Sequence, residues 1–98
     1  MNPIIRKIGE LDRVLHEPGR LMIATLLYAV DQADFLYLQN ETGINKGTLS
    51  SHLTRLEEAG YVEISKTFRG KVPQTLPRLA PAGRKAFEDY RRKLKQVL

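Results

Sequence analysis

Residues 34–60, DFLYLQNETGINKGTLSSHLTRLEEAG, predict two helices joined by a tight turn. The first helix is expected over residues 35–42 and the second over residues 46–59, because a capping residue precedes each run and a glycine follows it. The boundary residues are Asp34 and Asn45 as N-caps, and Gly43 and Gly60 as the residues that end the helices. The residues expected to face inward from the first helix and the turn are Phe35, Leu38 and Ile44.

The second of these helices has two chemically different faces. Leu49, Leu53 and Leu56 fall within about 60° of the helix circumference and form a stripe that we expect to be buried. The opposite face carries small or polar residues, namely Gly47, Thr48, Ser51, Thr54, Arg55 and Glu58. Small side chains let a helix approach base edges in a major groove, where hydroxyl groups can donate or accept hydrogen bonds. The alternative is an ordinary amphipathic helix whose outer face is solvated.

The rest of the chain is expected to form three more helices, a short strand and a hairpin. Ile4, Ile8, Leu11 and Leu15 recur at helical spacing and predict a first helix that breaks at residues 16–19. The later elements are a core helix from Pro18 to Val30, a very short strand at 33–35, a strand over 61–68, a turn at Arg69-Gly70, a return strand over 71–79 and a last helix over 81–97. The predicted fold is mainly α with a small β wing, a winged helix-turn-helix in the order helix, helix, strand, helix, helix, strand, strand, helix.

The hairpin gathers polar side chains around its turn, namely Lys66, Arg69, Lys71 and Gln74, with Gly70 in the turn. Mobile cations can bind phosphates, and a minor groove accepts an arginine. The alternative is a hairpin whose charges only solubilise it. Phe68 is unusual in a solvated loop, and we expect it either to pack at the base of the wing or to touch a sugar. Pro73 and Pro77 have the same parity, so both missing N–H groups lie on one side of the return strand and blunt one edge.

Charge is distributed unevenly along the 98 residues, whose formal net charge is +5. Residues 1–60 contain six basic and eight acidic residues (net −2), whereas residues 61–98 contain ten basic and three acidic residues (net +7). Between Ile64 and Phe87 there are six basic residues and no acid. A one-sided basic face favours a polyanionic partner, although a solvated surface would show the same excess.

Several function classes find no support in the sequence. The chain has no cysteine, which excludes disulfides and thiolate metal sites and fits a reducing cytoplasm. No apolar run approaches the roughly 20 residues of a membrane span, and the N-terminus lacks a hydrophobic signal core. Ser51 and His52 are adjacent on a helix and cannot face each other, so they predict no catalytic pair. His16 and His52 are far apart in sequence, and we expect His52 to flank the core or meet a phosphate rather than bind a metal.

Residues 38–62 resemble the core of the ArsR/MarR-type winged helix-turn-helix regulators, and most closely their short single-domain members. The resemblance extends over nearly the whole chain. Residues 16–20 are similar to the opening of their second helix, residues 68–75 to their wing, and Leu79, Gly83-Arg84 and Phe87 to the start of their last helix. Two positions depart from the family pattern. Ala80 stands where a capping threonine or serine is usual, and Pro77 stands in the strand that usually pairs with the short strand near residue 35, so the base of the wing could be loose.

The resemblance implies a homodimer in which the first and last helices pair and each recognition helix addresses one half-site. The implied base contacts are Thr48, Ser50, Ser51 and Thr54, and the implied wing contacts are Lys66, Arg69 and Lys71. With their neighbours, the candidate DNA-binding residues are Asn45, Lys46, Gly47, Thr48, Ser50, Ser51, Thr54, Arg55, Lys66, Arg69, Gly70, Lys71 and Gln74. The candidate dimer-interface residues are Ile4, Ile5, Ile8, Leu11, Tyr90, Leu94, Val97 and Leu98. The metal-sensing branch of the family is discounted, because its cysteine or clustered histidine ligands are absent.

The sequence therefore predicts one domain, residues 1–98, that acts as a sequence-specific regulator of transcription on double-stranded DNA. The recognition helix, about residues 46–59, would enter the major groove of a pseudo-palindromic site, and the basic wing, about residues 64–78, would contact phosphates or the minor groove. We expect a cytoplasmic protein with no enzyme activity, no cofactor and no membrane partner, and the sequence names no effector. The alternatives are a winged-helix module that binds another protein and a protein that coats chromosomal DNA without sequence preference.

Overall fold

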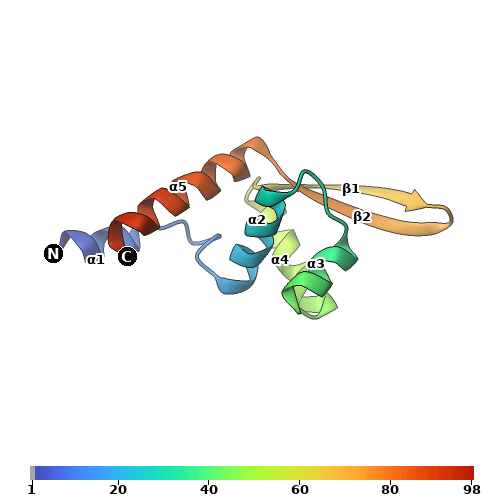
Figure 1. Ribbon diagram of the computed structural model, residues 1–98, viewed down its shortest axis with the longest axis horizontal. Helices are drawn as coiled ribbons and strands as arrows, with labels where there is room; N and C mark the ends of the chain where they lie inside the picture. Colours follow the sequence, from blue (N-terminus) through green and yellow to red (C-terminus); the bar gives the residue numbers. More distant parts are fainter. Residues whose placement is uncertain (1) are drawn as a thin grey trace.

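The computed structural model describes residues 2–98, which form an elongated molecule with extents of 57 × 25 × 21 Å (Figure 1). The elements in chain order are α1 (Pro3–Gly9), α2 (Pro18–Ala29), α3 (Phe35–Thr42), α4 (Lys46–Glu58), β1 (Val62–Arg69), β2 (Val72–Leu79) and α5 (Pro81–Val97). Helices α2, α3 and α4 pack together in the centre. The β1–β2 hairpin projects from one side of this centre, and α5 runs to the other side, where it lies beside α1 (Figure 1).

The core lies where α2, α3 and α4 meet. Six leucine or isoleucine side chains there are fully buried, namely Leu15, Ile23, Leu27, Leu38, Leu49 and Leu56. The predicted stripe of α4 is confirmed, since Leu53 is buried together with Leu49 and Leu56. Phe35 and Ile44 are partly buried and pack against the same core, as expected for inward-facing residues.

The predicted boundaries of α3 and α4 are confirmed by the cap geometry. The Asp34 carboxylate accepts a hydrogen bond from Tyr37 N (2.7 Å), and Asn45 Oδ1 accepts one from Thr48 N (2.9 Å). Gly43 ends α3 with φ of 71°, a left-handed conformation that glycine adopts without a steric penalty. Gly60, with φ of 78°, turns the chain from α4 into β1.

The first helix is shorter than predicted, and this prediction is corrected. Helix α1 ends at Gly9, and Leu11 and Leu15 are core residues of the irregular segment that follows. The Asp12 carboxylate accepts hydrogen bonds from Val14 N (2.8 Å) and Leu15 N (3.0 Å), and such local bonds compete with helical ones. The apolar spacing therefore reflected burial of this segment against the core rather than one continuous helix.

The predicted short strand at residues 33–35 is also wrong, because the described residues form a sheet of two strands only. Strand β2 pairs with β1 along its full length, with Phe68 opposite Pro73 and Ile64 opposite Pro77. Since that pairing is unbroken, the missing N–H groups of both prolines fall on the outer edge, where a third strand would have to pair. The segment before α3 instead meets β2 through a hydrogen bond from Gln74 Nε2 to Asp34 Oδ2 (3.2 Å).

The hairpin and the start of α5 differ from the prediction at two points and agree with it at a third. The turn is formed by Gly70 and Lys71, one residue later than predicted. Pro77 is fully buried, so the base of the wing is packed rather than loose. Ala80 precedes α5 without any side-chain cap, as its departure from the family pattern implied.

None of the helices within residues 2–98 has the length and hydrophobicity needed to cross a bilayer.

Candidate nucleic-acid interface

The outer face of α4 presents the small and polar side chains that the sequence placed there. Asn45, Lys46, Gly47, Thr48, Ser50, Ser51, Thr54 and Arg55 are all exposed. The first turn of α4 leaves backbone N–H groups without helical partners, of which Asn45 satisfies the one on Thr48. The remaining positive end of the helix dipole favours a phosphate oxygen nearby. The acidic Glu57 and Glu58 lie in the last turn, away from this end.

The hairpin flanks α4, and a groove separates the two. On one stretch of the groove, Ser50, Leu53 and Thr54 of α4 lie across from Ile64, Lys66 and Thr75 of the hairpin. On the adjoining stretch, Lys46 and Ser50 lie across from Arg69, Val72 and Gln74. The groove therefore brings together six of the thirteen candidate DNA-binding residues, namely Lys46, Ser50, Thr54, Lys66, Arg69 and Gln74. The other candidates, Thr48, Ser51 and Lys71 among them, do not line it. Gln74 is partly buried there and is held by Asp34, unlike the exposed cations.

The cations near the hairpin turn are electrostatically free, whereas those at its base are not. Arg78 pairs with Glu63 (2.9 Å), and on α5 Lys85 and Arg92 both pair with Asp89 (3.1 and 2.9 Å). The Lys85 and Arg92 hydrogen bonds hold the pKa of Asp89 below its ordinary value. Within residues 2–98, no ion pair involves the exposed wing cations Lys66, Arg69 and Lys71. The three wing cations are therefore available to pair with an anion from outside the chain.

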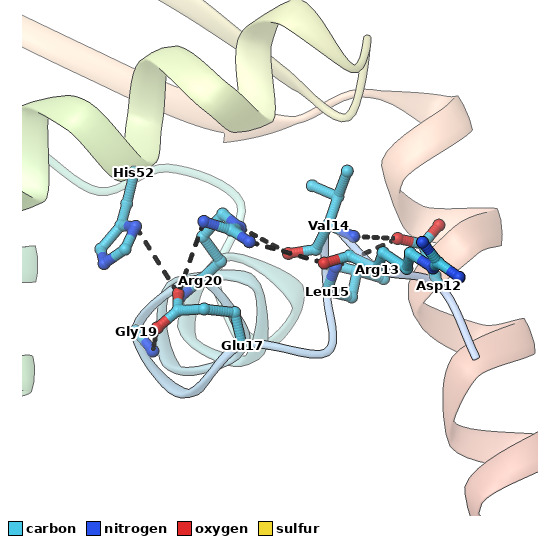
Figure 2. Close-up of polar contacts among 8 residues, drawn as sticks. All are labelled: Asp12, Arg13, Val14, Leu15, Glu17, Gly19, Arg20 and His52. Atoms are coloured by element: carbon cyan, nitrogen blue, oxygen red, sulfur yellow. Dashed lines mark hydrogen bonds and ion pairs between the residues drawn. The ribbon is translucent and has the colours of Figure 1, made fainter. Parts of the chain in front are cut away.

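A polar network braces the inner side of α4 against the start of α2 (Figure 2). Glu17 caps α2 by accepting hydrogen bonds from Gly19 N and Arg20 N (both 2.9 Å), and its carboxylate also lies 3.6 Å from His52 Nδ1 on α4. Burial alone would raise the pKa of Glu17, but the two backbone donors and the nearby His52 and Arg20 hold it below its ordinary value. Arg20 extends the network by donating to the Val14 carbonyl (2.6 Å). His52 thus flanks the core and positions α4, which is one of the two roles predicted for it.

A second contact set fixes the base of the hairpin to the rest of the chain. The Tyr61 hydroxyl donates to the Asp12 carboxylate, and burial together with that bond and the carboxylate charge raises the pKa of Tyr61 to about 12. The Tyr61 carbonyl accepts a hydrogen bond from Ala80 N (2.9 Å). Gly83 lies so close to Tyr61 that a Cβ there would overlap the Tyr61 carbonyl oxygen. The base of the hairpin is therefore attached to the rest of the chain through Tyr61.

Comparison with known proteins agrees with this geometry. A model of the winged helix DNA-binding domain matches residues 20–98. The chain belongs to that family. An uncharacterized protein of Methanocaldococcus jannaschii is 34% identical over 79 residues, which cover 80% of this chain and 85% of that protein.

Solved structures show the same winged helix. A transcriptional regulator homologue from Pyrococcus horikoshii has a TM-score of 0.87 and 26% identity, and the alignment covers 94% of this chain and 93% of that one. A MarR-family transcriptional regulator from Silicibacter pomeroyi shares the fold with a TM-score of 0.69 and 18% identity, over 96% of this chain and 62% of that one. The predicted resemblance to winged helix-turn-helix proteins is thereby confirmed, and the chain carries a winged helix DNA-binding domain.

The candidate dimer-interface residues divide into two groups in this winged helix. Leu11 and Tyr90 are 4% and 3% exposed, so they are part of the core of the single chain rather than of a free surface. The hydroxyl of Tyr90 lies 2.8 Å from His16 Nδ1. The other candidates remain accessible, with Ile4, Ile5, Ile8 and Leu98 exposed and Leu94 and Val97 partly buried. Helix α1 buries none of its residues in the single chain.

Sequence reasoning missed Glu17, the residue that braces α4 against α2. Its only signal was indirect, because Pro18 marks the start of α2 and so places Glu17 at the N-cap position. Its contact with His52 had no such signal, because the two residues come together only through packing of α2 against α4. Phe68 was expected, on one reading, at the base of the wing. It lies instead next to the turn and is exposed, which excludes that reading.

Proposed function

We propose that the chain binds double-stranded DNA sequence-specifically, with α4 in the major groove and the hairpin on the flanking backbone or minor groove. The observation that supports this most is the continuous groove between α4 and the hairpin, which has small polar side chains on one wall and free cations at its outer end. Small polar groups can read base edges, whereas cations on phosphates supply affinity without reading sequence. The two functions are thus assigned to different elements.

The reading role is assigned to Thr48, Ser50, Ser51 and Thr54, with Asn45, Lys46, Gly47 and Arg55 positioned to contact the backbone or base edges near the start of α4. The clamping role is assigned to Lys66, Arg69 and Lys71, with Gly70 allowing the tight turn and Gln74 bracing the hairpin. Residues 34–60 carry a net charge of −2, because they contain two basic and four acidic residues. The wing must therefore supply most of the electrostatic attraction.

The proposal includes a homodimer formed through α1 and α5. Helix α1 exposes Ile4, Ile5 and Ile8 and contacts α5, whose partly buried Leu94 and Val97 lie toward the C-terminus. Burial of these apolar side chains against a second copy would stabilise the pair, since each large aliphatic side chain gains about 1.5–3 kcal/mol when fully buried. Two copies would place their α4 helices on half-sites about 34 Å apart, on a pseudo-palindromic sequence.

Selection of bound duplexes from fragmented genomic DNA tests sequence specificity. We expect enrichment of a pseudo-palindromic motif, and the selected duplex should compete far better than a shuffled duplex of the same composition. Equal competition would indicate coating without sequence preference, and failure to retain any duplex would favour a protein-binding module instead.

Two single variants separate the assigned roles. Lys71→Ala should weaken binding to selected and shuffled duplexes by the same factor, because its target is a phosphate. Ser51→Ala should change the ratio of the two affinities, because its target is a base edge. The reverse pattern would contradict the assignment of roles.

A further inference from the structure

The tip of the wing carries an exposed aromatic side chain that the fold does not use. Phe68 is 69% exposed, and its neighbour Val72 is 65% exposed. The other two phenylalanines are packed, with Phe87 buried and Phe35 partly buried against the core. Full burial of a phenylalanine side chain would contribute about 1.5–3 kcal/mol to the free energy of unfolding. The exposed Phe68 does not make this contribution.

The strand register shows which way Phe68 faces. Side chains alternate between the two faces of a strand, so Phe68 lies on the same face as Ile64 and Lys66. Ile64 and Lys66 line the groove opposite α4. Phe68 pairs with Pro73, which lines the adjoining stretch of the groove. On this same face Val62 is buried and Ile64 packs against the core, so the face is turned toward the body of the molecule. Phe68 and Pro73 form its outermost, apolar end.

The surroundings of this apolar tip indicate its partner. Lys66, Arg69 and Lys71 all lie within three residues of Phe68 in the sequence, and no acidic residue occurs between Ile64 and Phe87. A polyanion would pair with these cations. The apolar ring needs in addition an uncharged surface close to the negatively charged groups that the cations bind. The minor groove of duplex DNA offers that combination, with phosphates at its rims and sugars and base edges on its floor.

We propose that Phe68 is a wedge that enters the minor groove beside the major-groove contact of α4 and partly unstacks one base step. This inference rests on the proposed function and adds a mechanism of recognition to it. Apolar wedges of this kind kink a duplex, typically by about 20–90°. Pyrimidine–purine steps unstack most easily, so the wing selects a flexible step through deformability rather than through hydrogen bonds to bases.

Duplexes that carry the fluorescent base 2-aminopurine at successive positions of the selected site test the wedge. Binding of the wild-type chain should raise 2-aminopurine fluorescence at one step on each side of the site, and energy transfer between end labels should report a bend. Phe68→Ala should abolish both signals and lower affinity roughly 5- to 150-fold, the range found for loss of aromatic stacking on a base. Phe68→Leu, which keeps an apolar wedge, should retain part of both.

Met22→Ala is a matched control, because Met22 is another exposed apolar residue, 42% exposed, on α2. It should leave fluorescence, bending and affinity unchanged. If Phe68→Ala binds and bends DNA like the wild type, the wedge is refuted while DNA binding stands. If Phe68→Ala instead changes the oligomeric state in sedimentation, Phe68 contacts another copy and the wedge is also refuted. If the wild-type chain binds no duplex at any salt concentration, the proposed function itself fails.

Discussion

Gly47→Ala should make the protein more stable and a weaker DNA binder at the same time. Gly47 is the second residue of α4, and a Cβ there would meet only Asn45 Oδ1, at an ordinary contact distance of 3.7 Å. Alanine in place of glycine within a helix gains about 0.5–1 kcal/mol, because glycine loses more conformational freedom on folding. For a domain of this size, that gain corresponds to a rise in Tm of about 2–8 °C.

The same methyl group would point toward the DNA in the proposed complex. An added methyl in a close-packed contact costs about 1–3 kcal/mol, which is a roughly 5- to 150-fold loss of affinity for the selected duplex. Thermal unfolding and fluorescence anisotropy on one preparation measure both effects. Gly9→Ala is the control, because Gly9 ends α1 and a Cβ there meets no atom within 4 Å. It should leave affinity unchanged. A stabilised Gly47→Ala variant with unchanged affinity would refute close approach of α4 to DNA.

Two further substitutions test the bracing of the groove. Gly83→Ala should lower the free energy of unfolding, measured by urea titration, by about 1–3 kcal/mol. The added methyl group would overlap the Tyr61 carbonyl, and this cost outweighs the helical gain of about 1 kcal/mol. Increased stability would contradict the close packing of Gly83 against Tyr61. For Glu17, the lowered pKa means that its stabilising contribution is present above the ordinary value of 4.5 and is lost as pH falls through the folded-state pKa. Glu17→Gln should thus be less stable than the wild type near pH 7, and this difference should shrink below pH 4.5; a constant difference would show that the carboxylate charge is not involved.

The elements of the helix-turn-helix were predictable because their ends are encoded locally. Asp34 and Asn45 each accept a hydrogen bond from a backbone N–H group only three residues away, and Gly43 and Gly60 adopt positive φ angles. Such signals need no knowledge of the tertiary fold. The same holds for the leucine stripe of α4, since its spacing is that of a helix packed on one side.

The errors arose where a tertiary contact decides the local conformation. Leu11 and Leu15 have helical spacing, but Asp12 turns the chain between them and reaches Tyr61, which is 49 positions away. Whether a third strand can pair with β2 depends on which edge of β2 faces β1. The spacing of the two prolines shows that one edge lacks N–H groups, but it does not show which edge that is. The candidate site was predictable as a set of exposed polar residues, whereas the groove that unites them was not.

The salt dependence of binding to the selected duplex tests the division between a reading helix and a charged wing most directly. Each phosphate neutralised contributes about −0.9 to the slope of log affinity against log salt. Three free wing cations in each of two chains therefore predict a slope of about −5, measured by anisotropy between 50 and 200 mM salt. Replacing Lys66, Arg69 and Lys71 together with alanine should remove most of that slope and leave the selected duplex preferred over the shuffled one. A flat response of the wild-type chain, or a slope that the triple substitution leaves unchanged, would contradict the account.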